Sequence, residues 1–182
     1  MKGLSARSFF FLAVLLFNVE KSAADPGDLL QTFLQPNPAV DDRFGWSVAW
    51  VDGHVFVGTP FDDTWETNAG AVYMFDVDGT LLQNFPSPNP AVSGLFGNSV
   101  AVMGDRFLVG ANYDNGGTGA AYLFNVDGTL LQTFLSPNPG GANQFGNSVA
   151  LTGNQVLVGA HQDLFGGTIR TGAAYLFDTD GT

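Results

Sequence analysis

The sequence contains no cysteine, and this absence excludes several kinds of protein at once. Neither a disulfide framework, a thiolate metal site nor a cysteine nucleophile can be built. Basic residues are also scarce, with 6 Lys and Arg against 17 Asp and Glu, which gives a net charge of −11. Such a chain repels the phosphates of nucleic acid, and we therefore expect no nucleic-acid partner.

Glutamate and lysine are almost missing, since only Glu20, Glu66, Lys2 and Lys21 occur. Both residue types favour helix interiors, whereas Asp and Gly favour turns, and the chain has 15 Asp and 24 Gly. Hydrophobic residues make up 45% of the chain, which is enough to bury a core. No segment shows a sustained apolar period of 3.6 residues. This balance predicts an all-β protein.

Long apolar runs are missing except near the amino terminus. Residues 1–24 begin with positive charges, continue with the nine-residue apolar run 9–17 and end in small residues. This order is typical of a secretory signal peptide, and the run is too short to cross a bilayer core of about 30 Å. We therefore expect a secreted, extracellular or cell-surface protein without a membrane span, whose mature part is 25–182.

The remaining chain consists of three copies of one unit, at approximately 27–78, 79–127 and 128–182. Four markers recur in phase: LLQ-x-F at 29–33, 81–85 and 130–134; FG-x-SVA at 44–49, 96–101 and 145–150; VG at 57–58, 109–110 and 158–159; G-A-x-Y-x-F at 70–75, 119–124 and 172–177. Only the interval between the last two markers varies in length. A constant framework with one variable loop often presents that loop on a binding face.

Each unit predicts four short strands. The first two are joined by a two-residue hairpin turn at 52–53, 104–105 or 153–154. A turn containing Asp and Gly leads from the third strand to the fourth, and a proline-containing stretch then ends the pairing. The third unit has no fourth strand, whereas the stretch 29–33 is a fourth strand that precedes the first unit.

Four-stranded units of about 50 residues have the size of propeller blades. The motifs FG-x-SVA, LVGA and G-A-x-Y-x-F resemble the FG-GAP repeat, known from the β-propeller of integrin α chains and from secreted bacterial proteins. The resemblance implies three four-stranded antiparallel blades and a non-catalytic role in ligand binding or adhesion. It also implies that the variable loops 60–69, 112–118 and 161–171 share the ligand-binding face with the connections that lead into each FG motif.

Candidate ligand-binding residues lie in these variable loops. An acidic residue recurs two positions after the triplets GTP (58–60), GAN (110–112) and GAH (159–161). An exposed loop tryptophan is a suitable anchor for an extracellular protein or carbohydrate. Turn chemistry and weak ligand or metal contact both remain open for the acidic residues. The candidates are Asp62, Asp63, Trp65, Asn112, Asp114, His161 and Asp163.

A second set of aspartates lies in the turn before the fourth strand, and we expect them to serve turn chemistry. The members are Asp76, Asp78, Asp127, Asp178 and Asp180.

Catalysis is not expected from this chain. Ser47, Ser99 and Ser148 each follow a glycine in a pattern that resembles a nucleophile elbow, but a nucleophile does not recur three times in phase, and no helix follows. We interpret these serines as structural hydrogen-bonding groups. Two alternatives remain, namely the propeller portion of a secreted hydrolase or lyase whose catalytic residues lie outside this chain, and a structural cell-surface oligomer.

Three blades are fewer than the roughly four to eight that close a propeller. The sequence is therefore either a piece of a longer protein or a chain that completes its ring by self-association through open blade edges. On the innermost strand, Trp50 replaces Val102 and Leu151, and we expect it to pack at a blade edge.

Calcium removal is expected to leave the melting temperature unchanged. The calcium loop of integrin-type repeats lies between the first two strands, where this chain has only two residues, too few to wrap an ion that takes about 6–8 oxygens. We expect no cofactor. Thermal melting with and without a chelator tests this point, and destabilisation by the chelator would restore calcium as a weak possibility.

Overall fold

The computed structural model describes residues 25–139, 141–165 and 169–181. The chain divides into two compact units, 1–30 and 31–182. The signal-peptide prediction for 1–24 lies outside the described residues. In the part of the first unit that is described, Asp28 closes a turn by donating its backbone N–H to the carbonyl of Asp25 at 3.0 Å.

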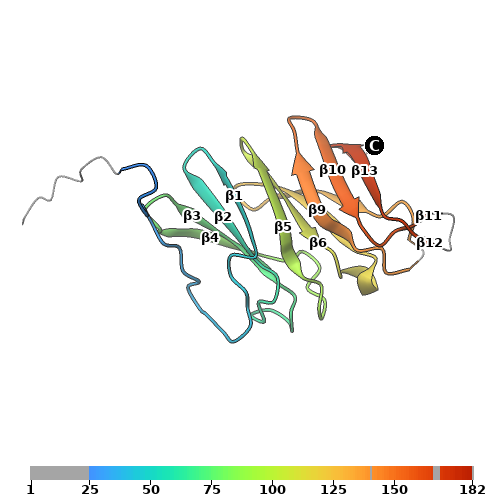
Figure 1. Ribbon diagram of the computed structural model, residues 1–182, viewed down its shortest axis with the longest axis horizontal. Coiled ribbons are helices and arrows are strands. Elements are labelled where there is room, and N and C mark those ends of the chain that lie inside the picture. The colour runs from blue at the N-terminus through green and yellow to red at the C-terminus, as the bar shows by residue number, and fades with distance from the viewer. Residues whose placement is uncertain (1–24, 140, 166–168, 182) are drawn as a thin grey trace, which may run out of the picture. The chain divides into compact units, whose positions relative to one another are not determined.

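The second unit is built from three antiparallel sheets, which confirms the all-β prediction (Figure 1). The first has the order β1(Ser47–Val51), β2(His54–Thr59), β3(Ala71–Asp76), β4(Leu81–Pro86). The second has the order β5(Phe96–Met103), β6(Arg106–Ala111), β7(Ala120–Asn125), β8(Leu130–Leu135). The third has the order β9(Phe145–Leu151), β10(Gln155–Ala160), β13(Ala173–Asp178).

Short elements in the variable loops were not anticipated from the sequence. The 3-10 turn η1(Asn115–Gly117) lies in the second loop, and the two-stranded ribbon of β11(Leu164–Phe165) and β12(Ile169–Arg170) lies in the third. Length variation between repeats is therefore absorbed by small local structures while the sheets keep their register.

The hairpin turns form where they were expected, for local reasons. Asp52 and Gly53 have φ angles of 47° and 83°, the left-handed conformation that a two-residue hairpin turn needs. The turn sets the register so that Val51 lies opposite His54 and Ser47 opposite Gly58.

Turn chemistry is also confirmed for two of the aspartates before the fourth strand, Asp76 and Asp127. Asp76 accepts the backbone N–H of Thr80 at 2.8 Å, and Asp127 accepts that of Thr129 at 2.9 Å. The hydrogen bonds from Thr129 lower the pKa of the Asp127 carboxyl group, because they favour its charged form.

The prediction of a strand at 29–33 is wrong. This stretch forms no strand in the described structure, because a strand needs the edge of a neighbouring strand, and no third strand of a preceding blade is present. Within the second unit, Phe33 nevertheless packs on Phe75, with ring centroids 5.7 Å apart.

Trp50 also departs from its prediction. The side chain is 69% exposed rather than packed, because the described residues form no sheet that covers this face of β1.

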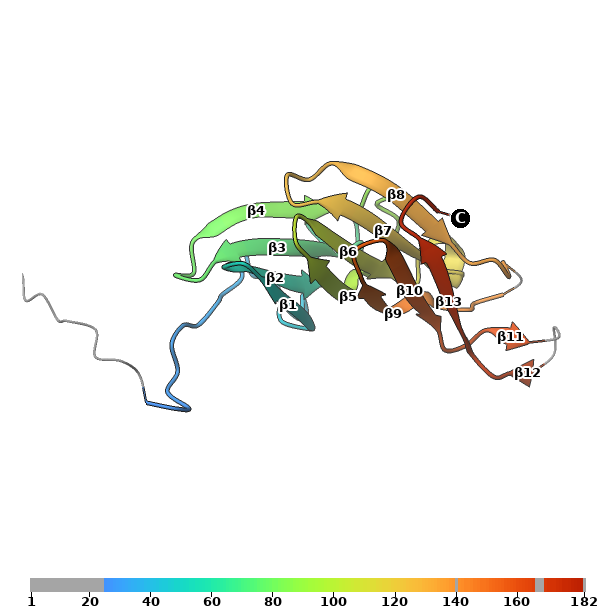
Figure 2. The same cartoon turned by 90° about the horizontal axis from the view of Figure 1, so that it is seen from above.

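The core lies between successive sheets. Figure 2 shows from above how the three sheets follow one another. Between the first and second sheets, the buried ring of Phe107 lies 5.0 Å from Phe56, 4.7 Å from Phe85 and 5.0 Å from Phe124. A second cluster, which includes the buried side chain of Phe145, joins the second and third sheets. Each fully buried phenylalanine contributes about 1.5–3 kcal/mol of transfer free energy.

A glycine notch lets each sheet dock closely against the next. Ser47 donates its hydroxyl to the carbonyl of Gly97 at 2.8 Å, and Ser99 donates to the carbonyl of Gly146 at 2.9 Å. These bonds confirm the interpretation of Ser47 and Ser99 as structural hydrogen-bonding groups. Gly110 lies against the same carbonyl of Gly146, and a Cβ atom there would lie within 3.0 Å of it.

Replacing Gly110 by alanine is expected to destabilise the fold by about 1–3 kcal/mol, because the added methyl group overpacks the sheet contact. The matched control is Gly153→Ala, since Gly153 has open space around it and an ordinary φ. We expect the control to change the free energy of unfolding by less than about 0.5 kcal/mol. Urea denaturation measures the free energy of unfolding of both variants. Equal values would contradict the close packing that we assign to the glycine notch.

Candidate functional site

One end of the three sheets carries both classes of loop. Strands β2, β6 and β10 end there, and β3, β7 and β13 begin there, so the loops 60–69, 112–118 and 161–171 lie at this end. The connections that enter β1, β5 and β9 reach the same end. The topology therefore places the two loop types together, and we call this end the loop face.

Each variable loop is anchored by a buried aspartate and a tyrosine. Tyr73 donates its hydroxyl to Asp62 at 2.5 Å, and Asp62 is 1% exposed. Tyr122 donates in the same way to the buried Asp114. The third copy of this contact joins Tyr175 to Asp163.

The same aspartates accept a side-chain amide from the connection that enters the sheet. Gln35 donates to Asp62 at 3.2 Å, whereas Asn89 donates to Asp114 at 2.9 Å. In the third repeat Asn138 donates to Asp163 at 2.6 Å. Each carboxylate therefore ties a variable loop to a neighbouring connection and to a strand of its own sheet.

The candidate residues accordingly divide into interior and surface groups. The carboxylates of Asp62, Asp114 and Asp163 face the interior, as does Asn112, which donates to Asn147 at 3.4 Å. The exposed candidates are Asp63, Trp65 and His161.

The candidates come from three different loops, and the structure does not gather them into one cluster. Among the described residues, no group of three His, Asp or Glu side chains is arranged to hold a metal ion. Ligand contact by the exposed candidates remains a prediction.

An aromatic and basic cluster on the loop face was missed by the sequence reasoning. The guanidinium carbon of Arg43 lies 4.2 Å from the ring centroid of Phe61 and 5.5 Å from that of Trp46. The two rings meet edge to face, with centroids 6.0 Å apart. Trp46 is 51% exposed, so this cluster, which we call the Arg–Trp–Phe cluster, offers an open aromatic surface beside a positive charge.

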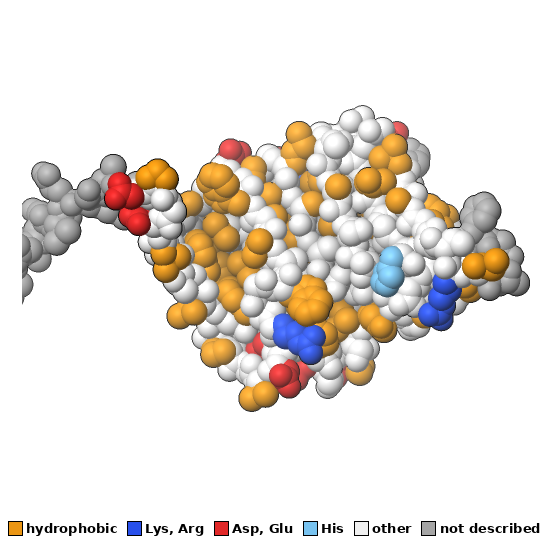
Figure 3. All heavy atoms as spheres, viewed as in Figure 1, with side chains coloured by type: hydrophobic (Ala, Val, Ile, Leu, Met, Phe, Trp, Pro, Cys, Tyr) orange, Lys and Arg blue, Asp and Glu red, His pale blue; other side chains and the backbone are white. Residues whose placement is uncertain are grey.

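One signal for this cluster was present in the sequence. Trp46 occupies the position of Asn98 and Asn147 in the other repeats, so the first repeat alone has an aromatic residue there. The space-filling view shows basic side chains next to hydrophobic ones, and few basic groups elsewhere on that face of the protein (Figure 3).

The comparisons with known proteins identify the repeat. The FG-GAP repeat family matches residues 30–75, 88–124 and 131–177, which together are more than half of the chain. No curated protein matches the chain. One similar solved structure is the crystal structure of the computationally designed Ika8 protein, at 16% identity and a TM-score of 0.48. That match covers 76% of this chain and 34% of the designed chain. The chain thus spans about a third of that protein's length.

No described helix is long and apolar enough to cross a membrane.

Replacing Tyr122 by phenylalanine is expected to cost about 1–3 kcal/mol, because the buried carboxylate of Asp114 loses a hydrogen-bond donor. The control is Tyr113→Phe, since Tyr113 is 44% exposed and its hydroxyl accepts a hydrogen bond from the neutral amide of Gln144 at 2.8 Å instead of donating to a carboxylate. We expect a smaller change for the control, of about 0.5–1 kcal/mol. Chemical denaturation measures the free energy of unfolding of both variants. An unchanged value for Tyr122→Phe would show that the anchor is dispensable.

Stability is expected to fall in strongly alkaline solution because of the three anchoring tyrosines. Burial, and then the hydrogen bond to Asp163, raise the pKa of Tyr175 to about 12. Burial is also the main cause that raises the pKa of Tyr73 and Tyr122. Since an unfolded tyrosine ionises at about pH 10, the unfolded chain loses these protons first as the pH rises.

The contribution of these tyrosines is therefore complete below about pH 10 and decreases from about pH 10 toward pH 12. Denaturation at several alkaline pH values measures it, and Tyr175→Phe should make the decline shallower. A decline of equal slope in that variant would contradict the assignment.

Proposed function

The chain belongs to the FG-GAP repeat family, and we propose that it is a secreted, non-catalytic ligand-binding module. Its loop face captures an extracellular carbohydrate or protein. The observation that carries this proposal is the Arg–Trp–Phe cluster, an exposed aromatic and cationic surface on a face built from the variable loops.

The framework beneath the loop face supports this role. The anchors formed by Asp62, Asp114 and Asp163 hold the base of each loop, while the residues beyond them differ between repeats. A rigid scaffold that presents divergent loops is a common arrangement for recognition, because the loops change without disturbing the core.

The chemistry of the cluster supports a ligand with both a flat apolar surface and polar groups. Trp46 presents half of its surface to solvent, and an indole ring buries a large area on contact at a small cost in conformational entropy. Arg43 lies beside it with a guanidinium group that can donate several hydrogen bonds to hydroxyl or carboxylate oxygens. A sugar ring and a protein side chain both fit this description.

The scarcity of positive charge narrows the class of ligand that suits the loop face. Only three cations, Arg43, Arg106 and Arg170, follow residue 24 of a chain that carries 17 acidic residues. A long polyanion would be repelled by most of the surface, so a neutral saccharide or a protein segment with an isolated acidic group suits the face better. Trp65 is 39% exposed on the same variable loop as Phe61, and it provides a second aromatic contact.

Binding is expected to decrease about 10-fold or more in Trp46→Ala, because an exposed aromatic anchor contributes much of the free energy of such contacts. Trp65→Ala should weaken the same binding. The measurement applies the purified chain to immobilised neutral oligosaccharides and, separately, to immobilised extracellular matrix proteins.

The control is Leu131→Ala, which removes a 41%-exposed side chain on β8, outside the cluster. Circular dichroism checks that each variant keeps its β structure. Capture that is equal in all variants, or the absence of capture on both surfaces, would overturn the proposal.

A further inference from the structure

One position on the loop face has the same backbone conformation in every repeat but a different side chain. Arg43, Leu95 and Gln144 immediately precede the three FG motifs, and their φ angles are 57°, 57° and 55°. A positive φ is uncommon for residues other than glycine, so the surrounding fold imposes this conformation whatever side chain is present. The framework therefore fixes where the side chain begins, and the backbone does not require the arginine of the first repeat.

The guanidinium group of Arg43 has no charged partner in the described part of the chain. It lies on the rings of Phe61 and Trp46 and forms neither an ion pair nor a hydrogen bond there. Arg170, on the third variable loop, instead donates to the side-chain oxygen of Gln162 at 2.8 Å. The hydrogen-bond donors of Arg43 are thus free to meet a ligand.

Three acidic residues of the segments that carry the Arg–Trp–Phe cluster are already engaged. The buried carboxylate of Asp42 accepts the backbone N–H of Ala39 at 2.7 Å, and the buried carboxylate of Asp62 accepts a tyrosine hydroxyl. Asp63 accepts the backbone N–H of Asn68 at 2.6 Å. An unpaired guanidinium beside engaged carboxylates is suited to a carboxylate that arrives from outside the protein.

The aromatic rings determine which part of the guanidinium group a ligand can reach. Its carbon lies 4.2 Å from the centroid of Phe61, so one face of the cation is covered by that ring. The N–H groups lie in the plane of the guanidinium, and a carboxylate binds there through two parallel hydrogen bonds. The same carbon is 5.5 Å from the centroid of Trp46. A ligand that contacts both groups therefore has a carboxylate close to a flat surface.

This short separation favours a sugar acid over an acidic peptide. In a uronic acid the carboxylate is attached directly to a pyranose ring, whose C–H groups present a flat apolar face. In an aspartate or glutamate of a peptide, the carboxylate ends a flexible chain that contains no ring. A uronic acid contacts Arg43 and Trp46 with one rigid unit, and so loses less conformational entropy on binding.

The other two repeats have uncharged polar side chains at the positions of Trp46 and Phe61. The members are Asn98, Tyr113, Asn147 and Gln162. Asn98 donates to the backbone carbonyl of Asn147 at 3.0 Å, which joins neighbouring repeats on this face. Amide and phenol groups exchange hydrogen bonds with hydroxyl groups, but they do not neutralise a second carboxylate.

We propose that the ligand of the loop face is an oligosaccharide with a single uronic-acid unit. Arg43 binds the carboxylate of this unit, and Trp46 packs against its ring. The inference rests on the proposed ligand-binding function of the loop face and narrows the ligand to one class. The remaining units are neutral, because the acidic surface of the protein repels further carboxylates.

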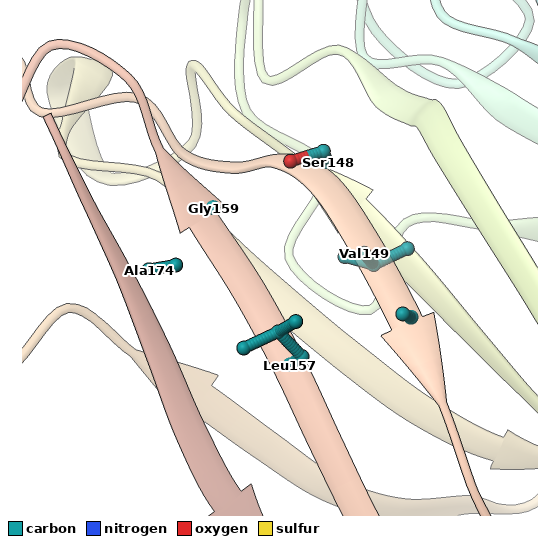
Figure 4. Close-up of a pocket in the computed structure, with 6 residues that line it drawn as sticks. Ser148, Val149, Leu157, Gly159 and Ala174 are labelled. Atoms are coloured by element: carbon teal, nitrogen blue, oxygen red, sulfur yellow. The ribbon is translucent and has the colours of Figure 1, made fainter.

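A shallow hollow on the third sheet offers no comparable site (Figure 4). It is lined by Ser148, Val149, Leu157, Gly159 and Ala174, together with one further alanine. None of these side chains is charged, so the hollow has no partner for a carboxylate. A variant in this hollow therefore serves as a control for binding at the loop face.

Matched saccharides test the proposal. The probes are oligosaccharides with one glucuronic-acid or galacturonic-acid unit, each compared with its carboxyl-reduced form, in which glucose or galactose replaces the acid. The two forms of a pair differ only in a carboxylate against a hydroxymethyl group. Titration calorimetry is expected to show at least one acidic form binding about 10-fold more tightly than its reduced form, because reduction removes a charge-assisted contact.

Variants show whether Arg43 makes this contact. Arg43→Leu introduces the residue that the second repeat has at this position with the same φ, so the backbone is expected to keep its conformation. The variant should abolish the preference for the acidic form. The control Arg170→Leu removes an equal charge from the third variable loop and should keep the preference, as should Leu157→Ala in the hollow. Circular dichroism checks that each variant keeps its β structure.

The possible failures of this inference and of the proposed function are distinguishable. Equal binding of the acidic and reduced forms would overturn the inference and leave the loop face as a surface for neutral saccharides. Capture of matrix proteins without any binding of these saccharides would also overturn it, while the proposed function would stand. The absence of both kinds of capture would overturn both. A loss of preference in either control as large as that in Arg43→Leu would contradict the role of Arg43.

Discussion

The fold depends on one contact, in which a glycine on the second strand of a sheet lets the carbonyl of the next sheet's FG motif approach it. The serine opposite that glycine donates its hydroxyl to the same carbonyl. Glycine is required because a Cβ at Gly58 or Gly110 would meet that carbonyl oxygen. This contact fixes the spacing between sheets, and the phenylalanine layers fill the remaining space to interior density. The repeated glycine and serine of the sequence are thus the two sides of a single docking notch.

Contacts within a sheet could be predicted from the sequence, because they depend on neighbouring residues. The strands within each repeated unit, the hairpin dipeptides and the Asp-Gly turns formed where the repeats placed them. The structural role of Ser47 and Ser99 followed from their recurrence. Contacts between sheets were harder to predict. Trp50 is exposed and residues 29–33 form no strand because both depend on a neighbouring sheet, which no local pattern reveals. The family assignment, by contrast, needed only the motifs and is shown by the family match.

The loop face combines a framework that recurs in all three repeats with a surface that differs between them. The recurrence of a tyrosine in every third strand and an aspartate in every variable loop was visible in the sequence, but their pairing required the fold. Once paired, these residues leave the outer loop positions free to differ, and the Arg–Trp–Phe cluster arises from such a difference in the first repeat. Stability and recognition are therefore carried by different residues of the same loops. The ligand residues could not be settled from the pattern, since exposure and burial alternate within a few positions.

The docking contact is used twice among the described residues, between the first and second sheets and between the second and third. Hydrogen–deuterium exchange of the unchanged chain and of Gly110→Ala tests this account most directly, by following the backbone amides of β9, the strand that carries Gly146. The account predicts faster exchange in β9 of the variant, because the added methyl group loosens the docking of the third sheet on the second. Equal exchange of β9 in the two proteins would contradict it.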